Sequence, residues 1–199
     1  MRLSPKRCIL LSGFQPFGGR AVNVSAVLVA QLRGAVLEGY RIETVVLPVE
    51  YGRAFAKLSG RIRALRPAAV VSFGQGRGEK IAVERYARAM DRSCLMPDER
   101  RRLPDASRRG VIAGGPWKSG LPVVKIARRL AAAGIPARVS GNAGNYVCNW
   151  LFLQSVRHAR GSYPAGFIHL PPEGRLARMP ALKRVGRIVA ASVLESLPR

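Results

Sequence analysis

Short apolar runs alternate with segments of helical spacing along almost the whole chain, and this alternation limits the folds open to it. A continuous apolar run is typical of a buried strand, while apolar side chains three or four positions apart are typical of a helix with one packed face. We expect strands at residues 8–12, 41–47, 69–73, 137–140 and 165–169. We expect helices at residues 25–32, 51–65, 121–133, 146–159 and 182–197, and an ambiguous segment at 80–90 that favours extended structure. Strands separated by helices predict an α/β sandwich with a largely parallel sheet, in which functional groups gather where strands end and helices begin.

One irregular stretch, residues 91–119, interrupts this pattern and is rich in arginine and proline. A loop of this length in a compact chain is usually functional or mobile, so we expect a basic flap or an excursion beside the functional site. A chain of 199 residues fits one domain, and no linker divides it. We therefore expect residues 1–199 to form a single α/β domain.

The apolar runs are too short to cross a membrane, which takes about 20 residues. The first of them, residues 8–11, is also shorter than the core of a secretory signal, about 7 to 15 residues, and no cleavage-like site follows it. The three cysteines are scattered and fit neither a disulfide framework nor a zinc cluster. We therefore expect a cytoplasmic protein without a membrane span.

The chain is strongly basic, since 34 Lys and Arg against 11 Asp and Glu give a formal net charge of +23. A basic excess spread along the chain favours non-specific binding of polyanions such as RNA, DNA or anionic lipid surfaces. A general bias in composition with no selected partner is the competing interpretation. Aromatic residues make up only 7% of the chain and do not interleave with the basic runs, so a surface that stacks on bases is not indicated.

Cys148 has the chemical setting of a nucleophile. It follows the Gly- and Asn-rich run 140–145 and lies at the start of the predicted helix 146–159. The positive end of the peptide dipoles at a helix N-terminus favours the thiolate, which is the nucleophilic form. Of the other cysteines, Cys8 lies within an apolar strand and is expected to be a core residue, whereas Cys94 has cations nearby but no base close in sequence.

Two histidines are available as a base for such a thiol. His169 ends a predicted strand and is either a satisfied core residue or the base of a cysteine hydrolase. His158 lies near the end of a helix, where a solvated cation is the ordinary explanation. Glu84 lies in a fairly apolar segment and needs a partner there. It either pairs with an arginine at the surface, Arg85 or Arg88, or orients an imidazole.

Two glycine-rich loops follow predicted strands and are suited to form a binding slot. Phe14 and Phe17 flank a proline in the first loop, and the glycines after them allow a ligand to approach the backbone closely. A tight turn with two core aromatics is the alternative, and the glycine patterns that bind phosphate are missing. In the second loop the amide of Gln75 both donates and accepts hydrogen bonds, which suits an amide-like ligand.

Taken in order along the chain, these motifs resemble the pyroglutamyl peptidase I family, the pyrrolidone-carboxylate peptidases. The matching blocks cover most of the chain and are residues 12–19 with Asn23 and Ser25, 47–49, 73–85, 114–149 and 166–171. The blocks around Cys148 and His169 are specific, whereas the glycine-rich pieces alone would not be. The resemblance implies a three-layer α/β/α sandwich with a twisted, largely parallel central sheet. It also implies a cysteine exopeptidase that removes N-terminal pyroglutamate (5-oxoproline) from peptides.

The resemblance further implies roles for individual residues. Cys148 corresponds to the nucleophile, His169 to the base and Glu84 to the third member of a Cys-His-Glu triad. The remaining matches place the pyroglutamyl ring among Phe14, Phe17, Tyr146 and Val147, and the lactam near Gln75 and Asn23. Members of the family often form dimers or tetramers, so a homodimer or homotetramer is expected. No His, Cys and carboxylate cluster has ligand spacing, so neither a metal nor another cofactor is implied.

Departures from the family's pattern bear on these implications. Gln15 stands in place of an acidic residue, Val83 in place of a proline and Trp150 in place of a histidine. Residues 93–98 are one residue longer than the family's loop and lack its arginine, which acts near the carbonyl in the family. Arg92 is a candidate substitute.

Three functions therefore stay open from the sequence. The matched motifs favour a pyroglutamyl peptidase that works through Cys148. A relative with the same triad and an altered loop would instead prefer another N-terminal group. A basic polyanion-binding protein on a hydrolase scaffold would bind nucleic acid in a salt-sensitive way that does not depend on Cys148.

Overall fold

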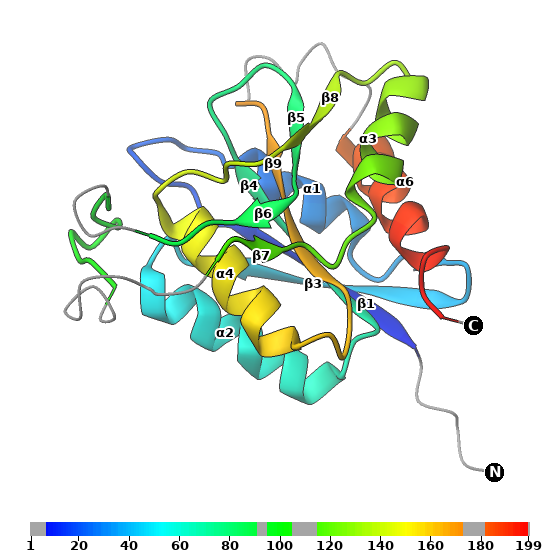
Figure 1. The fold of residues 1–199 in the computed structure, drawn as a ribbon, viewed down its shortest axis with the longest axis horizontal. Helices are drawn as coiled ribbons and strands as arrows, with labels where there is room; N and C mark the ends of the chain where they lie inside the picture. Colours follow the sequence, from blue (N-terminus) through cyan, green and yellow to red (C-terminus); the bar gives the residue numbers. More distant parts are fainter. Residues whose placement is uncertain (1–6, 91–94, 105–114, 173–181, 199) are drawn as a thin grey trace.

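The centre of the protein is a seven-stranded sheet with the strand order β2-β3-β1-β4-β9-β5-β8, and helices cover both of its faces (Figure 1). The structure is a computed structural model that describes residues 7–90, 95–104, 115–172 and 182–198. Its strands are β1 (Cys8–Phe14), β2 (Val36–Leu37), β3 (Tyr40–Leu47), β4 (Ala69–Gln75), β5 (Ile81–Glu84), β8 (Ala137–Ser140) and β9 (Ala165–Leu170). Its helices are α1 (Val24–Leu32), α2 (Tyr51–Leu65), α3 (Val123–Ala132), α4 (Val147–Ala159) and α6 (Leu182–Leu194). Two further strands, β6 (Tyr86–Ala87) and β7 (Trp117–Lys118), form a separate antiparallel pair.

The central sheet is mixed but mostly parallel. Strands β3, β1, β4 and β9 run in one direction, while β5 is antiparallel to β9 and parallel to β8. The reversal at β5 follows from its connection, because the loop 76–80 is too short to return across the sheet before the next strand begins. This reversal places the start of β5 beside the end of β9, with Ala82 opposite His169.

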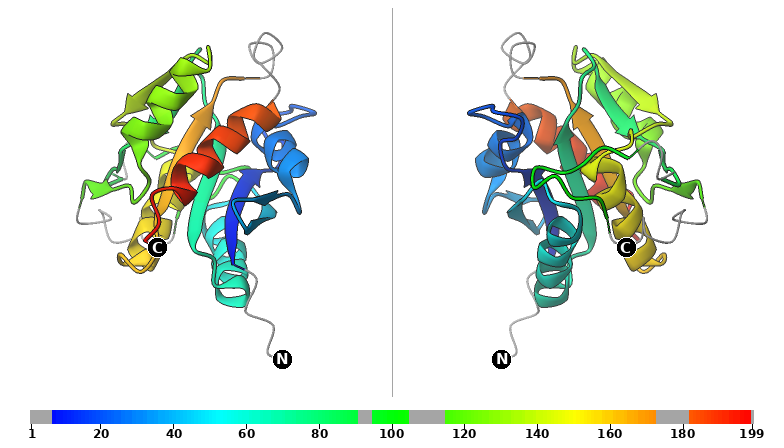
Figure 2. Two further views of the ribbon diagram at one scale, coloured as in Figure 1. Left: turned by 90° about the vertical axis from the view of Figure 1, so that its right-hand side faces the viewer. Right: turned by 90° about the vertical axis from the view of Figure 1, so that its left-hand side faces the viewer.

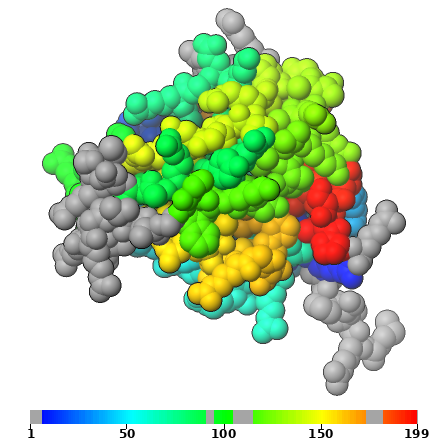
Figure 3. All heavy atoms as spheres, viewed as in Figure 1, coloured from blue at the N-terminus to red at the C-terminus, as the bar shows by residue number. Residues whose placement is uncertain are grey.

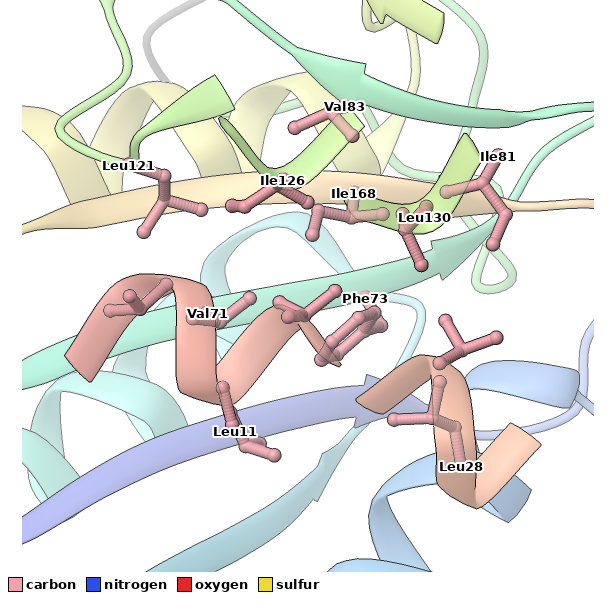
Figure 4. Packing of buried hydrophobic residues seen from close by; sticks show 14 of the residues in the cluster. Leu11, Leu28, Val71, Phe73, Ile81, Val83, Leu121, Ile126, Leu130 and Ile168 are labelled. Carbon is pink, nitrogen blue, oxygen red and sulfur yellow. The ribbon is translucent and has the colours of Figure 1, made fainter. Parts of the chain in front are cut away.

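The helices cover the sheet in two layers (Figures 1 and 2). Helices α1, α3 and α6 pack on one face around residues such as Leu28, Phe73 and Ile126, and Figure 4 shows part of this cluster. Helices α2 and α4 pack on the other face around Phe152 and Phe167. Every residue of β1 and β4 is buried, which explains why these strands are continuous apolar runs in the sequence. The expected three-layer α/β/α sandwich is confirmed.

The predicted elements correspond closely to those of the structure. The helix expected at 51–65 and the strand expected at 137–140 have the predicted bounds, and the others differ by a few residues at their ends. The preference of 80–90 for extended structure is confirmed by β5 and β6. The strands that the sequence does not indicate, β2 and β7, have two residues each, which is too short for an alternating pattern to be recognised.

Strands β6 and β7 lie against α4, and green atoms of this part of the chain adjoin the yellow atoms of that helix in Figure 3. The side chain of Asn149 joins the two layers, because it donates to the Arg88 carbonyl and accepts from the Arg88 N–H, each at 3.0 Å. In the described segments, no helix is both long enough and apolar enough to cross a membrane.

Candidate active site

Cys148 is the second residue of α4, and no side chain caps the start of this helix. The residue before the helix, Tyr146, has an extended backbone, and the first N–H bonded within the helix is that of Trp150, which reaches the Tyr146 carbonyl at 3.2 Å. The N–H groups of the first turn therefore point toward the same region as the thiol, together with the positive end of the helix dipole. Cys148 is partly exposed, although the residues on either side of it are fully buried.

Gly74 on β4 makes room for the thiol. A Cβ atom at this position would lie 3.2 Å from Cys148 Sγ and only 2.7 Å from Cζ of Phe167. Any larger residue would therefore displace the sulfur or the aromatic ring beneath it. The same glycine pairs with His169 on β9, so the sheet position without a side chain is next to the histidine.

His169 and Glu84 form a buried pair across β9 and β5. In the antiparallel register, Ala82 lies opposite His169, and Glu84 projects from the same face two residues further along β5. Nδ1 of His169 lies 2.9 Å from Oε1 of Glu84, with side-chain exposures of 14% and 1%. The second oxygen, Oε2 of Glu84, is buried and has no hydrogen-bond partner among the described residues. The pairing of Glu84 with Arg85 or Arg88, one of the two interpretations left open by the sequence, is wrong.

The charges around the imidazole favour its protonated form. Burial alone lowers the pKa of His169, but the hydrogen bonds and negative charges of Cys148 and Glu84 outweigh it and raise the pKa from 6.5 to about 9. Because Nδ1 is held by Glu84, Nε2 is the nitrogen left for Cys148. The arrangement suits a thiolate and imidazolium pair whose orientation is fixed by a carboxylate.

A cavity of about 640 Å³ opens onto these three residues. Its aromatic end is lined by Phe14, Phe17 and Tyr146. The rings of Phe17 and Tyr146 lie 6.3 Å apart between centroids, tilted by 42°. This end of the cavity is an apolar slot of the kind that the sequence indicates for the first glycine-rich loop.

Glu99 holds two sides of the aromatic slot, and no motif in the sequence indicates it. Its two carboxylate oxygens accept from the backbone N–H of Gly18 at 3.1 Å and from the hydroxyl of Tyr146 at 3.3 Å. Burial and the nearby Glu99 carboxylate raise the pKa of Tyr146, so its hydroxyl keeps the proton that it donates. Glu99 belongs to the irregular stretch 91–119, and the expectation that this stretch lies near the site is confirmed for its described residues Met96, Pro97 and Glu99, which all line the cavity.

Gln75 and Asn23 both line the cavity, and each also has a structural role. Oε1 of Gln75 accepts from the N–H of Val24 at 3.3 Å, at the start of α1. Asn23 caps the same helix, because its Oδ1 accepts from the N–H of Ser25 at 3.0 Å, while its Nδ2 donates to the Gln15 carbonyl at 3.0 Å. Asn23 is therefore mainly occupied with holding the loop, whereas the amide nitrogen of Gln75 is the better placed donor.

Val147 does not line the cavity, unlike the other residues matched to the pyroglutamyl ring. Its side chain is fully buried and packs in the core between the sheet and helices α2 and α4. As the first residue of α4, Val147 has its side chain in the core, whereas the next residue, Cys148, faces the cavity. Val147 can contact a ligand only through its N–H group.

The structure also shows the surroundings of the other residues that were named from the sequence. Cys8 is a core residue, as expected, and burial raises the pKa of its thiol. His158 is exposed near the end of α4, as expected. Trp150 is buried and meets Tyr51 edge to face at 5.9 Å, so it serves packing. Cys94 and Arg92 lie outside the described residues. Within the described part of the chain, no group of three or more His, Cys, Asp or Glu side chains is placed to hold a metal ion.

Comparison with known proteins agrees with this geometry. The profile of the pyroglutamyl peptidase family matches residues 7–180. A pyrrolidone-carboxylate peptidase of Chromobacterium violaceum is 40% identical over 168 residues, which cover 83% of this chain and 78% of the relative. One from Escherichia fergusonii is 39% identical over 175 residues, with the same coverage. Among solved structures, pyroglutamyl peptidase I of Bacillus amyloliquefaciens superposes with a TM-score of 0.81 at 29% identity, covering 95% of this chain and 97% of that one.

Proposed function

This chain belongs to the pyroglutamyl peptidase family and is a cysteine exopeptidase, and we propose that it uses Cys148, His169 and Glu84 to release pyroglutamate from the N-terminus of peptides. The observation that carries the assignment of the residues is the convergence of three separate elements on one cavity. The start of α4 supplies a thiol, the end of β9 an imidazole and the end of β5 a buried carboxylate. In a cysteine hydrolase the thiol is the nucleophile, the imidazole is the base, and the carboxylate orients the imidazole.

The pyroglutamyl ring occupies the aromatic slot in this proposal. The ring is apolar on both faces, carries one lactam N–H and one lactam carbonyl, and has no ammonium group. The side chains of Phe14, Phe17 and Tyr146 supply apolar surface for it. Gln75 supplies a donor for the lactam carbonyl, because its oxygen is already held by Val24 and its nitrogen is left for a ligand.

The reaction proceeds by acyl transfer. The Cys148 thiolate attacks the carbonyl carbon that joins the pyroglutamyl ring to the next residue, and the N–H groups at the start of α4 stabilise the oxyanion. The His169 imidazolium then gives its proton to the departing amine, and the C–N bond breaks to leave a thioester on Cys148. Neutral His169 next removes a proton from water, which attacks the thioester and releases pyroglutamate. Glu84 fixes the ring orientation of His169 throughout and stabilises its charged form.

The test is the initial rate of hydrolysis of a pyroglutamyl-coumarin amide in a reducing buffer. Wild type is expected to turn the substrate over, and Cys148→Ala to lose turnover while keeping its melting temperature. Cys8→Ala is the matched control, because Cys8 is a buried thiol far from the cavity lining, and it keeps the activity. Full activity of Cys148→Ala would refute the assignment of the nucleophile.

The other sequence-based expectations stay proposals. A catalytic thiol must remain reduced, which fits the expected cytoplasmic location. The homodimer or homotetramer and the non-specific binding of polyanions also remain predictions. A shifted N-terminal specificity would show as rapid alkylation of Cys148 without turnover of the pyroglutamyl substrate.

A further inference from the structure

Besides Arg20, which lies over the Phe17 ring, three basic side chains line the cavity, and the proposed chemistry does not use them. They are Arg77, Lys80 and Arg138, and all three are exposed. None of them takes part in a salt bridge with another described residue. Exposed cations that form no salt bridge attract anions to the surface around them.

The register of the sheet puts Arg138 in line with His169. Ala82 of β5 pairs with His169 on one side and with Arg138 of β8 on the other. Paired residues on neighbouring strands point to the same face. The neighbours of Arg138, Ala137 and Val139, pack into the core of the opposite face, so Arg138 extends over the face that carries His169. Two strand spacings of about 4.8 Å separate the Cα atoms of His169 and Arg138 by about 10 Å.

The loop that connects β4 and β5 brings the other two cations to the same place. A Cβ atom on Gly76 would lie 3.2 Å from Cβ of His169, so the backbone of this loop passes directly beside the histidine. Arg77 follows Gly76 in the chain, and Lys80 immediately precedes β5. All three cations therefore lie on the elements next to His169 on its β5 and β8 side, and they line the same cavity as the histidine.

The direction of the bound substrate follows from the strand order. Phe14 ends β1, His169 lies on β9, and Arg138 lies on β8, with β4 and β5 between them. A ring in the aromatic slot lies on the β1 side of the reacting groups. The departing amine has to lie beside His169 to receive its proton, so the rest of the peptide extends over β5 and β8. The first and second residues of the leaving peptide, at about 3.5 Å each, reach the three cations.

The acidic residues of the cavity do not neutralise this end. Glu84 is buried and bonded to His169, and Glu99 lies at the aromatic end, bonded to Gly18 and Tyr146. Glu79 also lies in this loop, directly before Lys80, and has a partner of its own. Three cations against this one further carboxylate leave the leaving-group end positive.

We propose that Arg77, Lys80 and Arg138 form a subsite for a carboxylate on the first or second residue of the leaving peptide. The carboxylate is either an Asp or Glu side chain or a free C-terminus, as in a pyroglutamyl tripeptide. This inference rests on the proposed function, since it assigns a specificity to the same cavity.

The experiment compares kcat/KM for three peptides: pyroglutamyl-Ala-Ala amide, the same peptide with a free C-terminus, and pyroglutamyl-Glu-Ala amide. Wild type at low salt is expected to prefer at least one of the two peptides with a carboxylate by about fivefold over the neutral amide, and the ratio shrinks at high salt. Which carboxylate gains identifies its source. In Lys80→Gln/Arg138→Gln the ratio falls toward one, while turnover of the neutral amide stays unchanged.

The matched control is Arg128→Gln/Lys183→Gln, which removes the same charges from exposed positions on α3 and α6, on the other face of the sheet. It is expected to keep the preference of wild type. Equal kcat/KM for all three peptides in wild type would overturn the subsite. The uncharged coumarin amide separates this failure from a failure of the proposed function, because its turnover needs the triad but no carboxylate.

Discussion

Replacing Glu84 by Gln changes one charge at the centre of the proposed triad and almost nothing in shape. The Gln side chain can still accept a hydrogen bond from Nδ1 of His169 at the 2.9 Å separation of the present pair. Its amide nitrogen takes the place of Oε2, which is buried without a hydrogen-bond partner among the described residues. A buried amide N–H group without an acceptor costs about 1–3 kcal/mol, so the variant is expected to be less stable but folded.

The effect on the imidazole follows from its surroundings. The pKa of His169 is raised from 6.5 to about 9, against the effect of burial, by Cys148 and Glu84 together. This rise corresponds to about 3 kcal/mol in favour of the charged ring. Without the Glu84 charge, only Cys148 opposes burial, so the pKa of His169 falls. The imidazolium that protonates the departing amine is then lost at lower pH. Gln can also donate to Nδ1, so the ring tautomer is no longer fixed, and for this reason kcat at neutral pH is expected to fall by about 10²- to 10⁴-fold.

The assay is the pH profile of kcat/KM for the pyroglutamyl-coumarin amide, wild type beside Glu84→Gln. In wild type the activity declines on the alkaline side near the pKa of His169, about 9. In the variant this decline moves to lower pH and the plateau drops. Circular dichroism and a thermal melt show that the variant is folded at the assay temperature. A loss smaller than threefold with an unchanged alkaline limb would refute the role of Glu84 in charging and orienting His169.

Three further substitutions test other parts of the site. Gly74→Ala forces a Cβ atom to within 2.7 Å of Phe167. We expect kcat to fall about tenfold or more, and the free energy of unfolding to fall by about 1–3 kcal/mol. An unchanged kcat would show that the thiol does not need this space. Asn149→Ala removes both hydrogen bonds to the Arg88 backbone. The free energy of unfolding, measured by urea denaturation, should fall by about 1–3 kcal/mol. An unchanged midpoint of the urea transition would contradict a role of Asn149 in joining α4 to β6 and β7. Glu99→Gln weakens the hold on the aromatic slot and should raise KM about two- to fivefold with kcat retained, and an unchanged KM would speak against that role.

Local patterns were enough to predict most of the fold. Every residue of β1 and β4 is buried, so each strand is a continuous apolar run. Such a run can be recognised without knowing which strands lie next to it. The direction of β5 is different, because it depends on the length of the loop 76–80 and on which strand β5 joins. The short strand β7 depends on pairing with the distant β6 and leaves no pattern of its own.

Some residues of the candidate site could likewise be predicted from local patterns, and others could not. Cys148 could be singled out because the start of a helix is visible in the sequence, and His169 because a strand end is. The pairing of Glu84 with His169 could not be derived from spacing, since it arises from the register between β5 and β9. Val147 shows the opposite error: it stands next to the nucleophile in sequence, but helix geometry turns its side chain into the core.

The central claim is that Cys148 carries the pyroglutamyl group between the two halves of the reaction. Mixing the enzyme with excess of a pyroglutamyl ester, quenching in acid within the first turnover and mapping the peptides by mass spectrometry tests it directly. The account predicts one pyroglutamyl thioester, on the peptide that contains Cys148, and a smaller amount at longer times after the substrate is exhausted. A pyroglutamyl group on Cys8 or Cys94 instead, or hydrolysis at full rate with no modified cysteine at any time, would contradict it.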